Sequence, residues 1–175
     1  MRRPLPFFLL VAAGIALDLV SKWIVFQWLA DDRTVALLPG VLHLTLARNY
    51  GVAFSMGKHL HSLWFVLLSL LFSVGLIWFY LRAWRTAAAL SILAMGMILV
   101  GAVGNMIDRL FFGYVRDFID FVPEIPLIGR WAIFNVADIC ITVGVVFYFI
   151  AELFLAPKPD AASQELRAKS QEPTA

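Results

Sequence analysis

The sequence predicts an all-α membrane protein that has four transmembrane helices and a small extracytoplasmic β-cradle in its first large loop. Apolar residues make up 62% of the 175 residues, only 15% are charged, and the mean hydropathy of +0.85 lies far above the range of soluble domains. The apolar residues are also gathered into four long runs that polar or turn-forming segments separate. A net charge of +2 is too small to indicate binding of nucleic acid, so we expect no such partner.

Each of the four runs is long enough to cross roughly 30 Å of hydrocarbon as a helix. We therefore expect transmembrane helices at about residues 7–29, 60–81, 87–107 and 133–155. The first run is longer than the apolar core of a signal peptide, and no convincing cleavage site follows it, so we expect it to be retained. Residues 1–155 then form a single four-helix domain. Residues 156–175 form a disordered cytoplasmic tail, because their Pro, Ser, Gln and mixed charge leave nothing to bury.

Basic residues near the helix ends predict the orientation in the membrane. Arg2 and Arg3 precede the first run, and Arg82 and Arg85 lie in the tight turn between the second and third runs, with no acidic residue nearby. Basic residues in short flanking segments favour the cytoplasmic side. We therefore expect both termini in the cytoplasm and the two larger loops on the outer side of the membrane.

The first large loop carries a pattern typical of a short β-strand. Large apolar residues alternate with smaller or polar ones through Val41–Ala47, and the Pro39-Gly40 step before them predicts a turn. The segment Asn49–Phe54 predicts a bend that dips into the membrane interface. His59 and His61 have no Cys or carboxylate ligands near them, so we expect no metal site and no cofactor.

Ionisable residues gather at one level of the predicted bundle. Asp18 and Lys22 share a face of the first helix because they are four residues apart. They are either a self-neutralising ion pair or part of a functional site. Since successive helices run in opposite directions, this pair lies at the same membrane face as Asn49, Asp108 and Asp138. Carboxylates at the edge of the hydrocarbon are costly, which makes them functional candidates.

The end of the third helix forms a polar corner. Asn105, Asp108 and Arg109 are related by spacings of three and four residues and therefore lie on one side of the helix. Gly101 and Gly104 let another helix or an extended substrate approach closely, and taken alone these glycines favour plain helix packing over a substrate role. The corner is thus a candidate part of a site.

Three aspartates, Asp108, Asp117 and Asp138, follow one another between the third and fourth helices. Asn135 is the predicted N-cap of the fourth helix, and Asp138 occupies the third helical position, as in a capping box. Two neighbouring carboxyl groups that share one proton also suit hydrolysis of an amide by water, one acting as base and the other as acid. The start of a helix favours an ionised Asp138 as the base. Position in the sequence favours Asp108 as the second carboxyl group of the pair, because it lies at the end of a helix. Position does not distinguish Asp117 from Asp120.

Two other classes of protein also place carboxylates at a membrane boundary. A small ion-coupled transporter more often has internal repeats and helices interrupted near the middle of the membrane, and the sequence shows no repeat. A noncatalytic assembly factor would use the glycine-rich helix faces and leave the carboxylates dispensable.

Five short blocks, taken together and in order, resemble the lipoprotein signal peptidases, the signal peptidase II family of four-span aspartic peptidases. The resemblance covers nearly everything from the first helix to about Leu155. Val100, Arg116 and Ile139 depart from residues that are usual in the family, without removing a reactive group. The matching blocks are Asp18-x-x-x-Lys22, Asn49-x-Gly51-x-Ala53-Phe54, Gly101-Ala-Val-Gly104-Asn105-x-x-Asp108-Arg109, Val115-Arg-Asp117-Phe118 and Phe134-Asn135-x-Ala137-Asp138.

The resemblance implies an aspartic endopeptidase whose catalytic pair is Asp117 and Asp138. The implied substrate is a prolipoprotein whose cysteine already carries diacylglycerol, cut just before that cysteine by water activated between the two aspartates. The residues implied to support the site or bind substrate are Asp18, Lys22, Asn49, Gly104, Asn105, Asp108, Arg109 and Asn135.

The same resemblance implies a location in the bacterial inner membrane, with the active site near the outer face. It further implies contact with membrane lipids and binding of globomycin-type inhibitors. Arg116 adjoins Asp117, and adjacent residues of an extended segment point to opposite faces. We therefore expect Arg116 to point away from the catalytic pair, toward lipid head groups or solvent.

Overall fold

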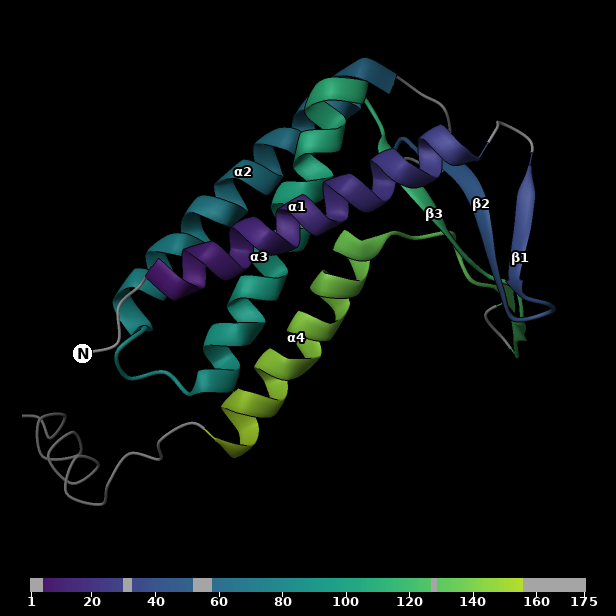
Figure 1. Cartoon of the computed structure of the whole chain (residues 1–175). Helices are drawn as coiled ribbons and strands as arrows, with labels where there is room; N and C mark the ends of the chain where they lie inside the picture. The colour runs from purple at the N-terminus through teal and green to yellow at the C-terminus, as the bar shows by residue number, and fades with distance from the viewer. Residues whose placement is uncertain (1–4, 30–32, 52–57, 127–128, 156–175) are drawn as a thin grey trace, which may run out of the picture.

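A computed structural model describes the chain over residues 5–29, 33–51, 58–126 and 129–155 (Figure 1). The expected disordered tail, residues 156–175, lies outside the described residues. So does the part of the expected interfacial bend that follows Gly51.

Within the described residues, four long helices form the body of the molecule. Each is long and apolar enough to cross a membrane, which confirms the predicted fold. The third helix is the central one, because 61% of its most apolar segment is buried, against 17% for each of the others, and it packs against all three. The helices are α1 Leu5–Trp28, α2 Lys58–Ala83, α3 Ala89–Phe112 and α4 Val136–Phe154.

Glycines bring α3 and α4 close together. A Cβ atom on Gly144 of α4 would lie 3.0 Å from the backbone oxygen of Ala94 in α3, and a Cβ atom on Gly101 would collide with the backbone oxygen of Ala137. Small residues at such crossings let helix backbones approach. The first turn of α4 is therefore held directly against the polar end of α3.

The central helix α3 runs further than the sequence indicated. Its expected end near residue 107 rested on Asp108 as a polar boundary, yet α3 continues to Phe112 and ends at Gly113, whose φ of 79° is left-handed. Asp108 is fully buried, because Lys22 and Arg116 neutralise its charge inside the protein. The helix is consequently free to add another turn beyond it.

A three-stranded antiparallel sheet lies at one end of the bundle, away from the amino terminus and the α2–α3 turn (Figure 1). Its middle strand matches the predicted strand in the first large loop, whereas its third strand comes from the second large loop. A short hairpin follows that third strand. The strands are β1 Thr34–Leu38, β2 Leu42–Asn49, β3 Val115–Phe121, β4 Glu124–Ile125 and β5 Gly129–Arg130.

Strand β3 connects the first loop to the start of α4. On one edge, Asp117 pairs with Ala47 of β2. On the other edge, Ile119 forms a bridge with Phe134, which directly precedes the N-cap of α4. The strand that carries Asp117 is thereby fixed beside the helix that carries Asp138.

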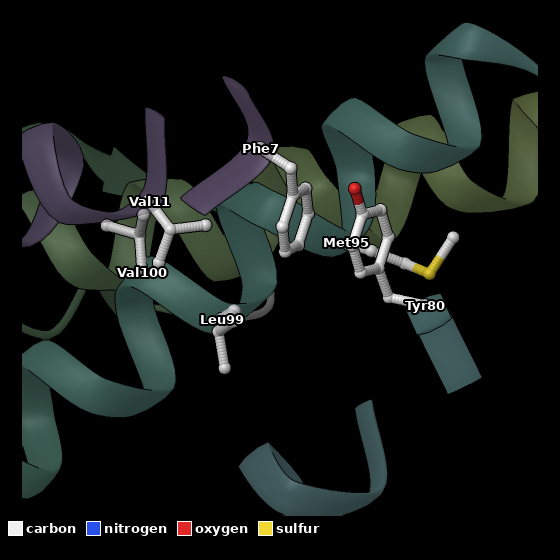
Figure 2. Close-up of a cluster of buried hydrophobic side chains, with 6 residues drawn as sticks. All are labelled: Phe7, Val11, Tyr80, Met95, Leu99 and Val100. Carbon is white, nitrogen blue, oxygen red and sulfur yellow. The ribbon is translucent and has the colours of Figure 1, made fainter. Parts of the chain in front are cut away.

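An apolar cluster packs α1 and α2 onto α3 at the other end of the bundle (Figure 2). Phe7 of α1 stacks on Tyr80 of α2 with ring centroids 3.7 Å apart. Between helices that cross a membrane, such packing stabilises through van der Waals contacts, because lipid tails are as apolar as these side chains. This packing holds the bundle together without using the polar end. The cluster comprises Phe7, Val11, Tyr80, Met95, Leu99 and Val100.

Candidate active site

Asp117 and Asp138 come from different elements and meet at one side chain, Asn135. The amide of Asn135 donates from Nδ2 to Oδ1 of Asp117 at 2.6 Å. Its oxygen accepts from the backbone N–H of Asp138 at 3.0 Å, and Oδ2 of Asp138 accepts from the backbone N–H of Asn135 at 3.1 Å. The predicted capping box is therefore confirmed. The same residue that begins α4 also holds the strand carboxyl group.

Asn105 of α3 joins the two sides of this arrangement. Its oxygen accepts from Lys22 Nζ at 3.0 Å and from Asn135 Nδ2 at 3.1 Å, and its own Nδ2 donates to Oδ1 of Asp138 at 2.8 Å. Because an ammonium group only donates, the contact with Lys22 fixes which end of the amide is oxygen. Both oxygens of Asp138 thus accept from N–H groups.

The carboxyl group of Asp117 is buried on β3, with only 1% of the residue exposed. Burial and repulsion from Asp138 raise its pKa to about 6, against the hydrogen bonds from Asn49 and Asn135 and the attraction of Lys22. Asn49 stands at the end of β2 and also closes a local turn, accepting from the backbone N–H of Gly51 at 2.9 Å. Asp117 therefore holds a proton more readily than an ordinary aspartate.

Lys22 lies beneath the two carboxyl groups and neutralises two further aspartates. Its Nζ lies 2.8 Å from Oδ2 of Asp18 and 3.2 Å from Oδ2 of Asp108, and all three side chains are fully buried. Asp18 also accepts the backbone N–H of Ala137, at 2.9 Å, in the first turn of α4. A Cβ atom on Gly104 would lie 2.5 Å from Oδ2 of Asp18, so glycine makes room for this carboxylate.

Arg116 points away from Asp117 as expected, but the prediction that it reaches lipid head groups or solvent is wrong. Its guanidinium is buried and donates to Oδ1 of Asp108 from Nη2 at 2.7 Å and from Nε at 3.1 Å. It also lies over the ring of Phe112, with Cζ 4.3 Å from the ring centroid. Strand alternation does send Arg116 and Asp117 to opposite faces, but the last turn of α3 covers the face that carries Arg116. The positive charge of Arg116 therefore neutralises Asp108 inside the protein.

Arg109 brings a further positive charge to the site. Its guanidinium lies 5.0 Å above the centroid of the Phe65 ring in α2, and its charge interacts with Asp138, Asp117 and Asp108. Nη1 also contacts the backbone oxygen of Asn105 at 3.4 Å. All the supporting residues suggested by the sequence are thus found around one centre, with Gly104 acting by its small size.

Asp120, the other strand aspartate, belongs to a separate arrangement. It accepts from Arg130 of β5 at 2.8 and 3.0 Å and from the hydroxyl of Thr45 in β2 at 2.9 Å. It lies three positions after Asp117, so alternation along β3 places the two on opposite faces. That odd spacing is the signal by which the sequence could have separated them, although it does not say which of the two faces the site.

An apolar cavity of about 390 Å³ adjoins Asp138. Sequence reasoning did not find its walls, because they come from the end of β3, the segment after β5 and one side of α4. The cavity is large enough for an apolar group beside the carboxylate. Across the part of the chain that the structure describes, no three His, Cys, Asp or Glu residues are grouped to hold a metal ion. The cavity is lined by Phe121, Trp131, Phe134, Ile139, Thr142 and Val143.

Comparison with known proteins agrees with this arrangement. A family model for signal peptidase (SPase) II matches residues 10–154. The lipoprotein signal peptidase of Chlorobaculum tepidum is 40% identical over 145 residues, which cover 79% of this chain and 88% of that protein. The lipoprotein signal peptidase of Gloeobacter violaceus is 38% identical over 174 residues, which cover 96% of this chain and 93% of that protein.

Solved structures show the same fold. A bacterial membrane enzyme determined by the in meso method at 2.3 Å resolution is 25% identical, with a TM-score of 0.72 over 97% of this chain and 94% of that chain. A second, determined by the same method at 1.9 Å resolution, is 27% identical, with a TM-score of 0.71 over 86% and 94% of the two chains. The chain belongs to the signal peptidase II family, the lipoprotein signal peptidases of bacterial membranes.

Proposed function

We propose that the chain is an aspartic endopeptidase that cuts diacylglyceryl-modified prolipoproteins just before the lipidated cysteine, with Asp117 and Asp138 as its catalytic pair. Membership of the family implies removal of signal peptides from prolipoproteins by a multi-pass membrane protease. The observation that carries the finer proposal is the Asn135 amide, which bonds Asp117 directly and caps the helix turn that presents Asp138. It brings two carboxyl groups from separate elements to one place.

The charges of the buried cluster support a pair that holds one proton. With every group ionised, the carboxylates outnumber the cations by one. A single proton on the pair removes that excess charge. The cluster joins four carboxyl groups to three cations, namely Asp18, Asp108, Asp117 and Asp138 with Lys22, Arg109 and Arg116.

The proton is assigned to Asp117 and the negative charge to Asp138. Asp138 accepts N–H groups at both oxygens and stands at the start of a helix, and both features favour a carboxylate. Burial and repulsion raise the pKa of Asp117, which favours the neutral acid. Below the raised pKa of about 6, the pair offers a base and an acid side by side, and at pH 7 about a tenth of the molecules hold the proton on Asp117.

In the proposed reaction, water lies between the two carboxyl groups beside the scissile amide. Asp138 takes a proton from the water as its oxygen attacks the carbonyl carbon, while Asp117 gives its proton to the carbonyl oxygen. The resulting diol breaks its C–N bond as Asp138 passes a proton to the leaving nitrogen and Asp117 recovers a proton from the diol. The products are the carboxyl end of the signal peptide and a free amine on the lipidated cysteine, and the pair returns to its starting state.

The apolar cavity beside Asp138 supports a lipid-modified substrate, because its aromatic and aliphatic walls suit a hydrocarbon group next to the scissile bond. We assign the end of the bundle that carries the sheet to the outer face, with both termini in the cytoplasm, because Arg82 and Arg85 lie at the other end. Residues 1–155 form the peptidase domain in this proposal. Globomycin-type inhibitors and membrane lipids are proposed as further ligands.

The test is a gel-shift assay of the purified full-length protein in detergent with a diacylglyceryl-modified prolipoprotein. Asp117→Asn and Asp138→Asn should each slow cleavage by roughly 10²- to 10⁴-fold, the usual worth of a positioned acid or base. Asp120→Asn is the matched control, because it removes a buried carboxyl group from the same strand but outside the site, and it should retain most of the activity. Thermal unfolding checks that all three variants are folded. Full cleavage by a folded Asp117→Asn or Asp138→Asn variant would exclude that residue from the catalytic pair.

A further inference from the structure

A second apolar cavity, of about 370 Å³, lies at the end of the bundle away from the sheet. Its walls come from the start of α1, the end of α2 and the start of α3, and they include Phe7, Tyr80, Trp84 and Leu93. Because these walls all lie at helix ends, the cavity is level with the boundary between hydrocarbon and head groups. None of the candidate catalytic or supporting residues lines it, so the catalytic role gives no account of it.

Tyr80 brings an unused polar group to this cavity. Only 2% of the residue is exposed, and its ring stacks on Phe7 (Figure 2). Among the described residues, no side chain or backbone group is hydrogen-bonded to the Tyr80 hydroxyl, and this oxygen is not one of the buried polar atoms, so it is open to a partner from outside the protein. A ligand in the cavity that carries an acceptor oxygen can supply that partner.

A positively charged side chain lies against one wall of the cavity. Arg85 lies over the ring of Trp84, one of the walls, with its Cζ 5.1 Å from the ring centroid. The start of α3 has no side-chain cap at Ala88 and adds partial positive charge, which Glu152 of α4 offsets in part through its contact with Ser91 at 3.3 Å. An apolar chamber with a cationic rim is complementary to a lipid that has hydrocarbon at one end and an anion at the other.

We propose that this cavity binds an anionic phospholipid, one of whose acyl chains lies against Phe7 and Leu93. Its ester or phosphate oxygens accept from the Tyr80 hydroxyl, and its phosphate lies close to Arg85. A zwitterionic lipid or a detergent fills the same space with less affinity, because its head group gains less from Arg85 and from the start of α3. The site is independent of the catalytic pair, so it stands whether or not Asp117 and Asp138 perform the cleavage.

The charge is tested by native mass spectrometry of the full-length protein with phosphatidylglycerol or with phosphatidylcholine of the same acyl chains. Wild type should retain phosphatidylglycerol more strongly. Arg85→Gln should weaken that binding roughly fivefold, since one basic residue near a membrane surface has about this effect, and should weaken phosphatidylcholine binding less, because choline offsets the phosphate charge. Arg82→Gln is the matched control, because Arg82 lies in the last turn of α2 over Trp78, also at 5.1 Å, and Trp78 does not line the cavity. Equal binding of the two lipids by wild type, or equal losses in the two arginine variants, overturns the proposal.

The cavity and the hydroxyl are tested separately. Leu93→Trp fills the cavity and should abolish retention of both lipids, whereas Leu153→Trp changes an exposed leucine of α4 outside the cavity and should have no effect. Tyr80→Phe keeps the ring but removes the donor, so it should weaken both lipids alike. Unchanged lipid retention by Leu93→Trp would place the lipid elsewhere and overturn the site. Thermal unfolding in detergent checks that each variant is folded, without reference to peptidase activity.

Discussion

Replacing Asp117 by Asn is expected to make the protein relatively more stable as the pH rises. The pKa of Asp117 is raised from 3.8 to about 6, chiefly by burial, and a shift of this size corresponds to about 3 kcal/mol. Since the folded protein favours the neutral carboxyl group, its contribution to stability is fully present below the unfolded value of 3.8. The contribution then decreases with rising pH and is lost above the folded value of about 6.

The measurable part of this effect lies between about pH 5 and about pH 7.5. Integrating the two titrations over that interval gives a loss of roughly 1.4 kcal/mol in wild type. The asparagine variant cannot ionise, yet its oxygen still accepts from Asn135, so it lacks this loss. For a chain of this length, the Tm of the variant relative to wild type should rise by roughly 3–6 °C between the two pH values.

The assay is thermal unfolding in one detergent, followed by intrinsic fluorescence, with wild type and variant compared at both pH values. Taking the difference between the two proteins cancels the titrations that they share. Asp120→Asn serves as the control, because Arg130 neutralises that carboxylate and its removal should give no stabilisation at pH 7.5. Equal differences between Asp117→Asn and wild type at both pH values would refute the protonated state assigned to Asp117.

Three further variants test the parts of the site that do not react. Asp108→Asn should destabilise the protein by about 3–5 kcal/mol, because Lys22 and Arg116 lose a buried counterion, while some cleavage remains; complete loss of cleavage in a well-folded variant would contradict its supporting role. Gly104→Ala should lower stability by about 1–3 kcal/mol by displacing Asp18, whereas Gly75→Ala, whose Cβ would meet nothing within 4 Å, should be neutral or stabilising in the same thermal assay. Asn135→Ser keeps a residue favoured at N-caps but removes the amide that bonds Asp117. Cleavage should therefore fall about a hundredfold, while circular dichroism shows unchanged helix content. Normal turnover would show that the hydrogen bond from Asn135 to Asp117 is not needed.

The four helices and the polar face could be predicted because they depend on local composition. Runs of apolar residues of sufficient length have few alternatives in a membrane, and the capping box of Asn135 and Asp138 is a short-range pattern. Strand β3 does not follow from local pattern, because it forms by pairing with β2 and with Phe134, both distant in sequence. The sheet therefore required tertiary contacts that periodicity does not reveal.

The choice of Asp117 over Asp108 also depends on tertiary contacts. Lys22 and Arg116 neutralise Asp108, and Arg116 reaches it because α3 continues beyond the expected end. Asp117, in contrast, receives its hydrogen bonds from the neutral amides of Asn49 and Asn135. Only the family resemblance identified Asp117 in advance, since both aspartates lie near a membrane boundary in the sequence.

The bond from Ala137 to Asp18 has a consequence for biogenesis, because it joins the first helix to the last. The ribosome makes α1 long before α3 and α4, so Asp18 and Lys22 enter the bilayer when only each other is available as a counterion. Their contact at four residues' spacing makes that early stage tolerable. When α3 arrives, Asp108 joins Lys22, and when α4 arrives, Asp18 takes up the N–H of Ala137. Asp18 and Lys22 thus first neutralise each other during insertion. The other residues of the site join them only after synthesis of the last helix.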